Sequence, residues 1–141
     1  VSTRSVCGRP FPSAPAFTEV STSDSDVRAS ARSLRRGEYD VAIHFASEAL
    51  GSGAASRHKN AAQINLCAAY AQDGQRRLAA EACDEAVRVN GDSWEALTNR
   101  GANAWLSGDA ERARADFAAA AELGGNNGAV AANSRLASCA G

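Results

Sequence analysis

Three glycines divide this chain into evenly spaced pairs of helix-like segments. Gly37, Gly74 and Gly108 each follow one such segment and precede another, at spacings of 37 and 34 residues. Alanine recurs five and twelve residues after each glycine, at Ala42, Ala79, Ala113, Ala49, Ala86 and Ala120. A period of about 34 residues with a turn between two helices predicts an all-α array of stacked helix pairs.

The period sets the expected boundaries of a single domain at residues 23–141. Three repeats are expected within it, at about residues 23–56, 60–93 and 94–127. A stack of helix pairs leaves an apolar end, and a closing helix covers it. The pattern of Val130 and Leu136 predicts such a capping helix over residues 129–139.

Residues 1–22 differ in composition from the rest of the chain. They hold all three prolines and many serines and threonines, and they show no helical period. This composition predicts a flexible N-terminal tail, with Phe11 and Phe17 as the side chains through which it would dock.

Bulk composition excludes several classes of function. The chain of 141 residues is 45% hydrophobic but only 6% aromatic, which favours close helix packing through small side chains. Its net charge of −1 argues against strong nonspecific attraction to nucleic acid or to an anionic membrane. No apolar run approaches the roughly 20 residues of a membrane span.

Residues 23–127 resemble the tetratricopeptide-repeat family, most closely in the third repeat. There Trp94 and Gly101 in the first helix are followed by the turn Gly108-Asp109 and by Phe117. In that family, small residues at the eighth, twentieth and twenty-seventh positions let paired helices approach closely. These positions correspond here to Ser30, Ala42, Ala49, Cys67, Ala79, Ala86, Gly101, Ala113 and Ala120.

The resemblance implies a right-handed superhelix of three repeats plus the capping helix, with the first helix of each pair lining an inner groove. Extended peptides or a partner's helix are the ligands that such a groove takes. Arg28, Asn65 and Asn99 occupy equivalent sixth positions on successive groove helices. Their side chains can hydrogen-bond a peptide backbone or carboxylate; the alternative is that they are merely solvated.

Two further features are candidates for ligand contact. Arg28, Arg32 and Arg35 form a helical stripe that would suit an acidic partner, although the alternative is a charged outer face neutralised by nearby carboxylates. Trp105 lies near the end of the third groove helix, where it would either anchor a peptide or belong to the core.

The four cysteines fit no zinc signature. In the repeat pattern, Cys67 and Cys83 lie on paired helices and face each other, as either a disulfide or two buried thiols, and the export expected below favours the disulfide. Cys7 and Cys139 would then form the remaining pair and tie the tail to the capping helix. Disulfides indicate an oxidising compartment.

Export is the favoured interpretation of several features together. The chain lacks methionine, its cysteine count is even, and its second repeat is similar to those of exported proteobacterial repeat proteins. We expect a bacterial periplasmic or secreted protein after leader removal; a cytoplasmic protein is the alternative.

The sequence offers no catalytic constellation. His44 and His58 are the only histidines, and neither stands at a telling distance from a nucleophile or carboxylate. No phosphate loop, nucleophile motif or metal motif occurs. We therefore expect a protein-binding scaffold, not an enzyme, with no cofactor and as a monomer or weak oligomer. The alternative is a structural, self-assembling component of the cell envelope.

Overall fold

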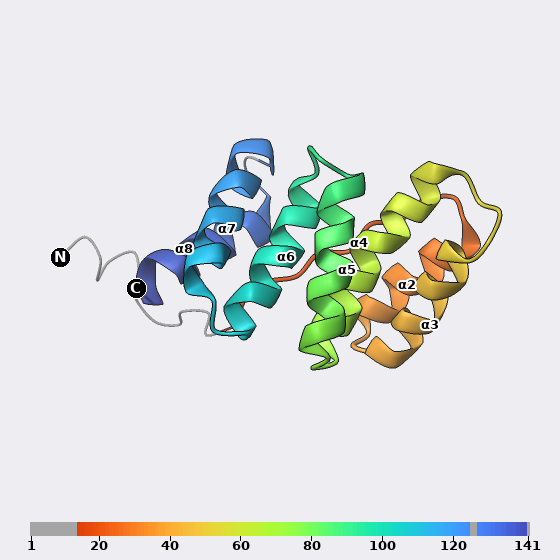
Figure 1. Cartoon of the computed structure of the whole chain (residues 1–141), viewed down its shortest axis with the longest axis horizontal. Helices are drawn as coiled ribbons and strands as arrows, with labels where there is room; N and C mark the ends of the chain where they lie inside the picture. Colours follow the sequence, from red (N-terminus) through yellow and green to blue (C-terminus); the bar gives the residue numbers. More distant parts are fainter. Residues whose placement is uncertain (1–13, 125–126, 141) are drawn as a thin grey trace.

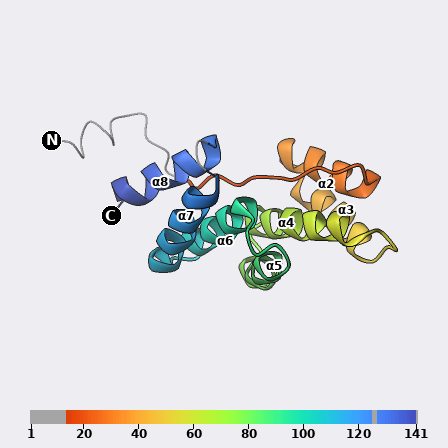
Figure 2. The same cartoon turned by 90° about the horizontal axis from the view of Figure 1, so that it is seen from above.

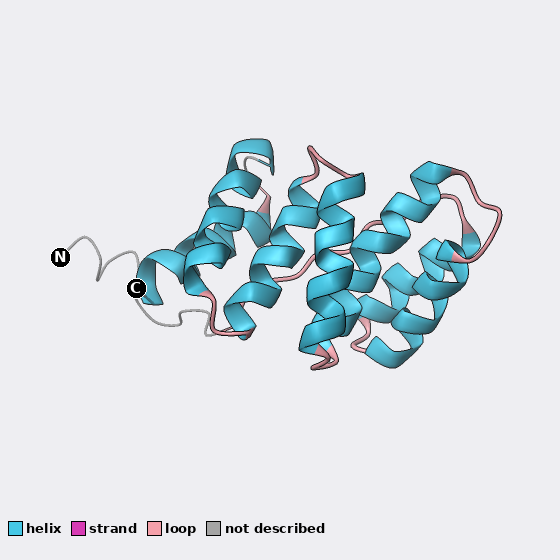
Figure 3. Ribbon diagram, in the orientation of Figure 1, coloured by secondary structure: helices cyan, strands magenta, loops and turns pink. Residues whose placement is uncertain are grey.

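The computed structural model describes residues 14–124 and 127–140, and within them the secondary structure is helical, without strands (Figures 1 and 3). Cys7 and Phe11 lie outside the described residues. The described helices are α2 (Ser25–Arg35), α3 (Tyr39–Leu50), α4 (Ser56–Gln72), α5 (Arg76–Val89), α6 (Trp94–Leu106), α7 (Ala110–Gly124) and α8 (Gly128–Ala140).

The three glycines end the first helix of each pair in the same way. Gly37, Gly74 and Gly108 have φ values of 73°, 82° and 87°, the left-handed region that side chains disfavour. In each turn the residue after the glycine donates its N–H to a carbonyl five residues earlier, as Glu38 does to Ser33 at 2.9 Å. This hydrogen bond satisfies a helix-terminal carbonyl and reverses the chain, so that two helices pack side by side.

Small residues form the contact between paired helices. All six recurrent alanines predicted from the glycine spacing are buried, each at most 1% exposed. Gly101 in α6 is the closest contact, because a Cβ atom added there would lie 2.8 Å from the Phe117 ring of α7. Large side chains are not needed where backbones approach this closely, which explains a core rich in alanine.

A disulfide joins the two helices of the middle pair. Cys67 on α4 and Cys83 on α5 are both fully buried, and their Cα atoms lie 4.6 Å apart. The expected pairing of these two cysteines is thus present. The expected pairing of Cys7 with Cys139 stays a prediction, since Cys7 lies outside the described residues.

Residues 14–22, here called the N-terminal arm, run in extended form along one face of the helical array. Figure 2 shows the arm crossing the face formed by α4, α6 and α8, with α5 on the opposite side. The arm ends at Asp24, whose side chain accepts hydrogen bonds from the N–H groups of Asp26 and Val27 and so caps α2. Sequence composition places these residues in a tail; the structure places them against the domain.

We predict that Gly101→Ala destabilises the protein by about 1–3 kcal/mol, because the added methyl group would overlap the Phe117 ring. Gly53→Ala is the matched control, since a Cβ atom there meets nothing within 4 Å. Denaturant unfolding followed by helical circular dichroism measures both. Equal stability of the two variants would contradict the close-packing account.

We also predict that the double variant Cys67→Ala, Cys83→Ala loses about 3 kcal/mol of stability, because the disulfide closes a loop of sequence separation 16. Unfolding curves of the native protein with and without reductant should differ by a similar amount. In the double variant, any remaining effect of reductant would report the predicted Cys7–Cys139 bond. A native protein whose midpoint ignores reductant would contradict a stabilising role for the Cys67–Cys83 bond.

Candidate functional site

Three buried asparagines line the face on which the N-terminal arm lies. Asn65 on α4, Asn99 on α6 and Asn133 on α8 stand 34 residues apart and are at most 1% exposed. Each occupies the same position of the 34-residue period. We call these three residues the asparagine ladder.

Each ladder amide binds both main-chain groups of one arm residue. The N–H of Val20 donates to Asn65 Oδ1, and Asn65 Nδ2 donates to the Val20 carbonyl, both at 2.8 Å. Asn99 makes the same pair of bonds with Thr18, both at 2.9 Å, and Asn133 with Ala16, at 2.7 and 3.0 Å.

The geometry of an extended chain explains the alternation. In such a chain the N–H and C=O of one residue point to the same side, and those of the next residue point to the other. Residues 16, 18 and 20 therefore face the ladder, while the main-chain groups of Phe17 and Glu19 face away. One asparagine serves every two residues, a distance of roughly 7 Å along the arm.

Further hydrogen bonds hold the ladder amides in orientation. Asn65 Nδ2 also donates to Ser30 Oγ at 2.9 Å, and Asn99 Nδ2 also donates to the Ile64 carbonyl at 3.2 Å. A rotated amide would aim its oxygen at these acceptors and its nitrogen at an N–H group. The amides of Asn65 and Asn99 are therefore oriented from within the repeats to offer an acceptor to an N–H and a donor to a carbonyl.

Side chains of the arm contact residues on both sides of the ladder, which we call the walls of the groove. Phe17 packs against two apolar clusters, one of Leu34, Ala42, Ala68 and Ala69 and the other of Ala102, Ala113 and Phe117. Glu19 pairs with Arg35 at 3.3 Å. Val20 packs toward α2 and α4, against the clusters that contain Val27 and Ile64.

Four of the five predicted peptide-contact residues meet the arm or its junction with α2. Asn65 and Asn99 form the floor, Arg35 pairs with Glu19, and Arg28 donates to the Ser23 carbonyl at 2.7 Å. Trp105 is half-buried and packs on the Phe117 ring at 6.4 Å between ring centres. It adjoins the same cluster as Phe17.

The sequence analysis missed Asn133 and the arm itself. Asn133 continues the interval that separates Asn65 from Asn99, so the period alone could have found it. Because residues 129–139 were interpreted only as a capping helix, Asn133 was not recognised as the next groove position. No periodic signal marks the arm as a groove occupant.

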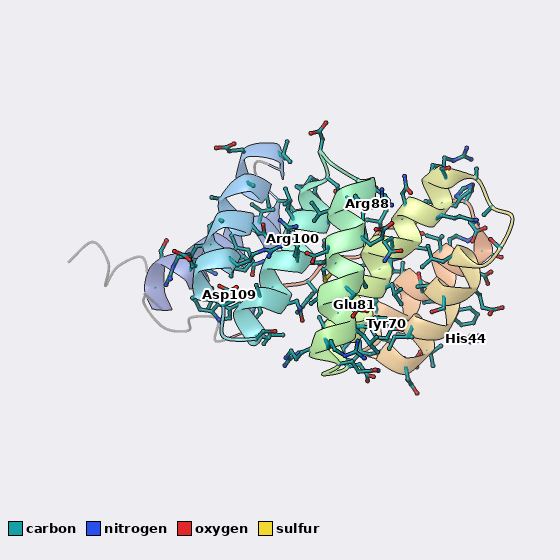
Figure 4. All side chains as sticks on the ribbon, in the orientation of Figure 1. His44, Tyr70, Glu81, Arg88, Arg100 and Asp109 are labelled. Atoms are coloured by element: carbon teal, nitrogen blue, oxygen red, sulfur yellow. A yellow bond between two sulfur atoms is a disulfide. The ribbon has the colours of Figure 1, made fainter. Side chains whose placement is uncertain are left out.

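The opposite face carries a charged cluster that joins the second and third helix pairs. Arg100 of α6, labelled in Figure 4, makes a two-point ion pair with Asp116 at 2.8 and 2.9 Å and approaches Asp84 of α5 at 3.6 Å. The hydrogen bond to Asp116 raises the pKa of the Arg100 guanidinium above its usual range. Arg112 also pairs with Asp84, at 3.1 Å. These contacts tie neighbouring repeats together.

Neither a metal centre nor a membrane span is found in the described part of the chain. Within residues 14–124 and 127–140, no three His, Cys, Asp or Glu side chains gather closely enough to hold an ion. Over the same residues, no helix combines the length and apolar character that crossing a bilayer requires. What the groove offers chemically is neutral amides, apolar walls and the guanidinium of Arg35.

Comparison with known proteins identifies the fold. No family model and no curated protein matches the sequence. The structure is similar to the crystal structure of the TPR domain of P58(IPK), with a TM-score of 0.70 and 18% identity. The match covers 79% of this chain and 32% of that one, so this chain spans about a third of the other's length. The expected tetratricopeptide-repeat fold is confirmed.

We predict that Asn99→Ala removes both hydrogen bonds to Thr18 and speeds hydrogen exchange at the Thr18 amide, with a stability loss of about 1–3 kcal/mol. The matched control is Asn103→Ala on the same helix. Asn103 is also buried, but its Oδ1 has no hydrogen-bond partner and it does not contact the arm's main chain. Exchange at Thr18 measured by NMR should respond only to the first variant. A similar response to both would contradict a specific contact.

Proposed function

We propose that this tetratricopeptide-repeat chain is a protein-interaction scaffold that binds an extended peptide of a partner protein along the asparagine ladder, without catalysis. The observation that carries the proposal is the six hydrogen bonds between the ladder and three alternate residues of an extended chain. The repeat fold supports a protein partner.

The ladder selects for extended chains over helices. A helical ligand uses its main-chain N–H and C=O groups internally, so it has none to offer to the amides of Asn65, Asn99 and Asn133. An extended peptide presents one N–H and one C=O on the same side at every second residue. Buried amides left without partners cost free energy, which works against ligands that cannot supply these groups.

We further propose that the scaffold works in an oxidising compartment, the periplasm or the extracellular space. The buried disulfide between Cys67 and Cys83 supports this, because such bonds persist chiefly outside the reducing cytoplasm. The disulfide joins α4 to α5 at Cys67, two residues after Asn65 on α4.

The test uses a peptide with the sequence of residues 14–22 as a probe and a full-length receptor whose own arm is loosened. The receptor carries Phe17→Ala, which removes the arm's apolar anchor, and Thr18→Pro, which removes the N–H that donates to Asn99. We call it the loosened-arm variant. Hydrogen exchange at the Ala16 and Val20 amides shows whether the arm has left the ladder.

We predict that the probe binds the loosened-arm variant and that N-methylation at its Thr18 equivalent weakens binding about 2- to 12-fold, the value of one neutral hydrogen bond. N-methylation at the Glu19 equivalent is the matched control, since that N–H faces away from the ladder. Fluorescence anisotropy measures both affinities. A released arm with no probe binding, or equal effects of the two methyl groups, would overturn main-chain recognition by the ladder.

A further inference from the structure

We infer that the N-terminal arm is a built-in competitor for the groove, and that the partner peptide shares the arm's pattern of an aromatic residue followed two positions later by an acidic one. This inference rests on the proposed function and adds its regulation and its selectivity.

The arm uses the whole recognition surface of the ladder. Every ladder amide has its oxygen and its nitrogen bound to an arm residue. A second extended chain cannot make these pairs of hydrogen bonds while the arm makes them, and the arm occupies the space above the floor. Binding of a partner and binding of the arm are therefore mutually exclusive along residues 16–20.

The walls distinguish one extended chain from another, which the ladder cannot do because main-chain groups are common to all peptides. On one wall, Phe17 packs against two apolar clusters at once. Glu19, two residues on and therefore on the same side of the arm, reaches Arg35 at 3.3 Å. An aromatic and an acidic side chain at this spacing are what the wall accepts.

Arg35 determines which sign of charge the ligand can carry at this position, and it adds little to affinity. Its side chain is 56% exposed, and exposed ion pairs contribute little free energy. However, Arg28 and Arg32 stand on exposed positions of the same helix, so a basic residue in place of Glu19 would meet repulsion. The apolar contact of Phe17 supplies the larger share of affinity.

The tether makes the arm an effective competitor even if its intrinsic affinity is low. The arm continues directly into α2 through the Asp24 cap, and Thr22 Oγ1 lies 2.7 Å from His58 Nδ1 of α4. Short tethers give effective concentrations on the order of millimolar. A free peptide displaces the arm when its concentration divided by its dissociation constant exceeds the arm's effective concentration divided by the arm's own dissociation constant. Otherwise the arm must be drawn away by another interaction before the groove opens.

The decisive experiment compares the affinity of the labelled probe for the native chain, the loosened-arm variant and a Ser21→Pro variant. Ser21 is exposed, and proline at position 21 makes the same backbone change where the N–H has no hydrogen-bond partner within the described residues. We expect the loosened-arm variant to bind at least about tenfold more tightly than the other two, because apparent affinity scales with the fraction of open grooves. In the probe, replacing Phe by Ala or Glu by Lys should weaken binding, and replacing Thr by Ser should not.

Equal binding to the native chain and the loosened-arm variant would overturn the inference but leave the proposed function standing. Absence of binding to a folded loosened-arm variant whose arm has left the ladder would overturn both. Should that variant fold poorly by circular dichroism, the native chain gives the same answer: excess unlabelled probe should speed exchange at the Val20 amide. Unchanged exchange at saturating probe would count against competition.

Discussion

Close approach of paired helices through alanine, glycine and cysteine is the constraint on which the structure depends. It brings the second helix of each pair against the first, and the left-handed glycine turns make this arrangement repeat. Repetition then places one position of each first helix on the same inner face. The asparagine ladder is the consequence: three amides in register, spaced so that alternate residues of one extended chain reach all of them. Larger residues at Ala79 or Ala113 would separate the helices and lose this register.

Buried polar side chains on the floor of a groove need hydrogen-bond partners, and the structure supplies them to the ladder from two sources. Asn65 and Asn99 are fully buried, and an amide buried without partners costs about 1–3 kcal/mol. Bonds to Ser30 and to the Ile64 carbonyl satisfy one donor of each amide from within the repeats. The remaining donor and the acceptor are left for an extended chain. The buried amides therefore need main-chain N–H and C=O groups as hydrogen-bond partners, and the arm supplies them.

The periodic part of this molecule could be predicted well from the sequence, because each helix pair packs in the same way and therefore needs small residues at the same positions of the repeat. The helix pairs and the buried alanines follow from spacing alone, and the repeat pattern places Cys67 opposite Cys83. Val41 is 37% exposed although it precedes the buried Ala42, since consecutive residues are turned about 100° around a helix. The arm was beyond prediction for a different reason. An extended segment bound through main-chain groups that every residue has shows no periodic pattern, and two side-chain contacts at Phe17 and Glu19 are too few to mark where it binds.

Self-occupancy also follows from the kind of recognition that the ladder provides. Main-chain hydrogen bonds accept any extended peptide, so an open groove would bind unfolded chains without discrimination. A tethered occupant sets a threshold that nonspecific peptides do not reach, because they lack the wall contacts of Phe17 and Glu19. Under the proposed function, a partner that matches the wall displaces the arm when the ratio of its concentration to its dissociation constant exceeds the same ratio for the tethered arm. Selectivity would then arise from the competition between two extended chains and not from the ladder itself.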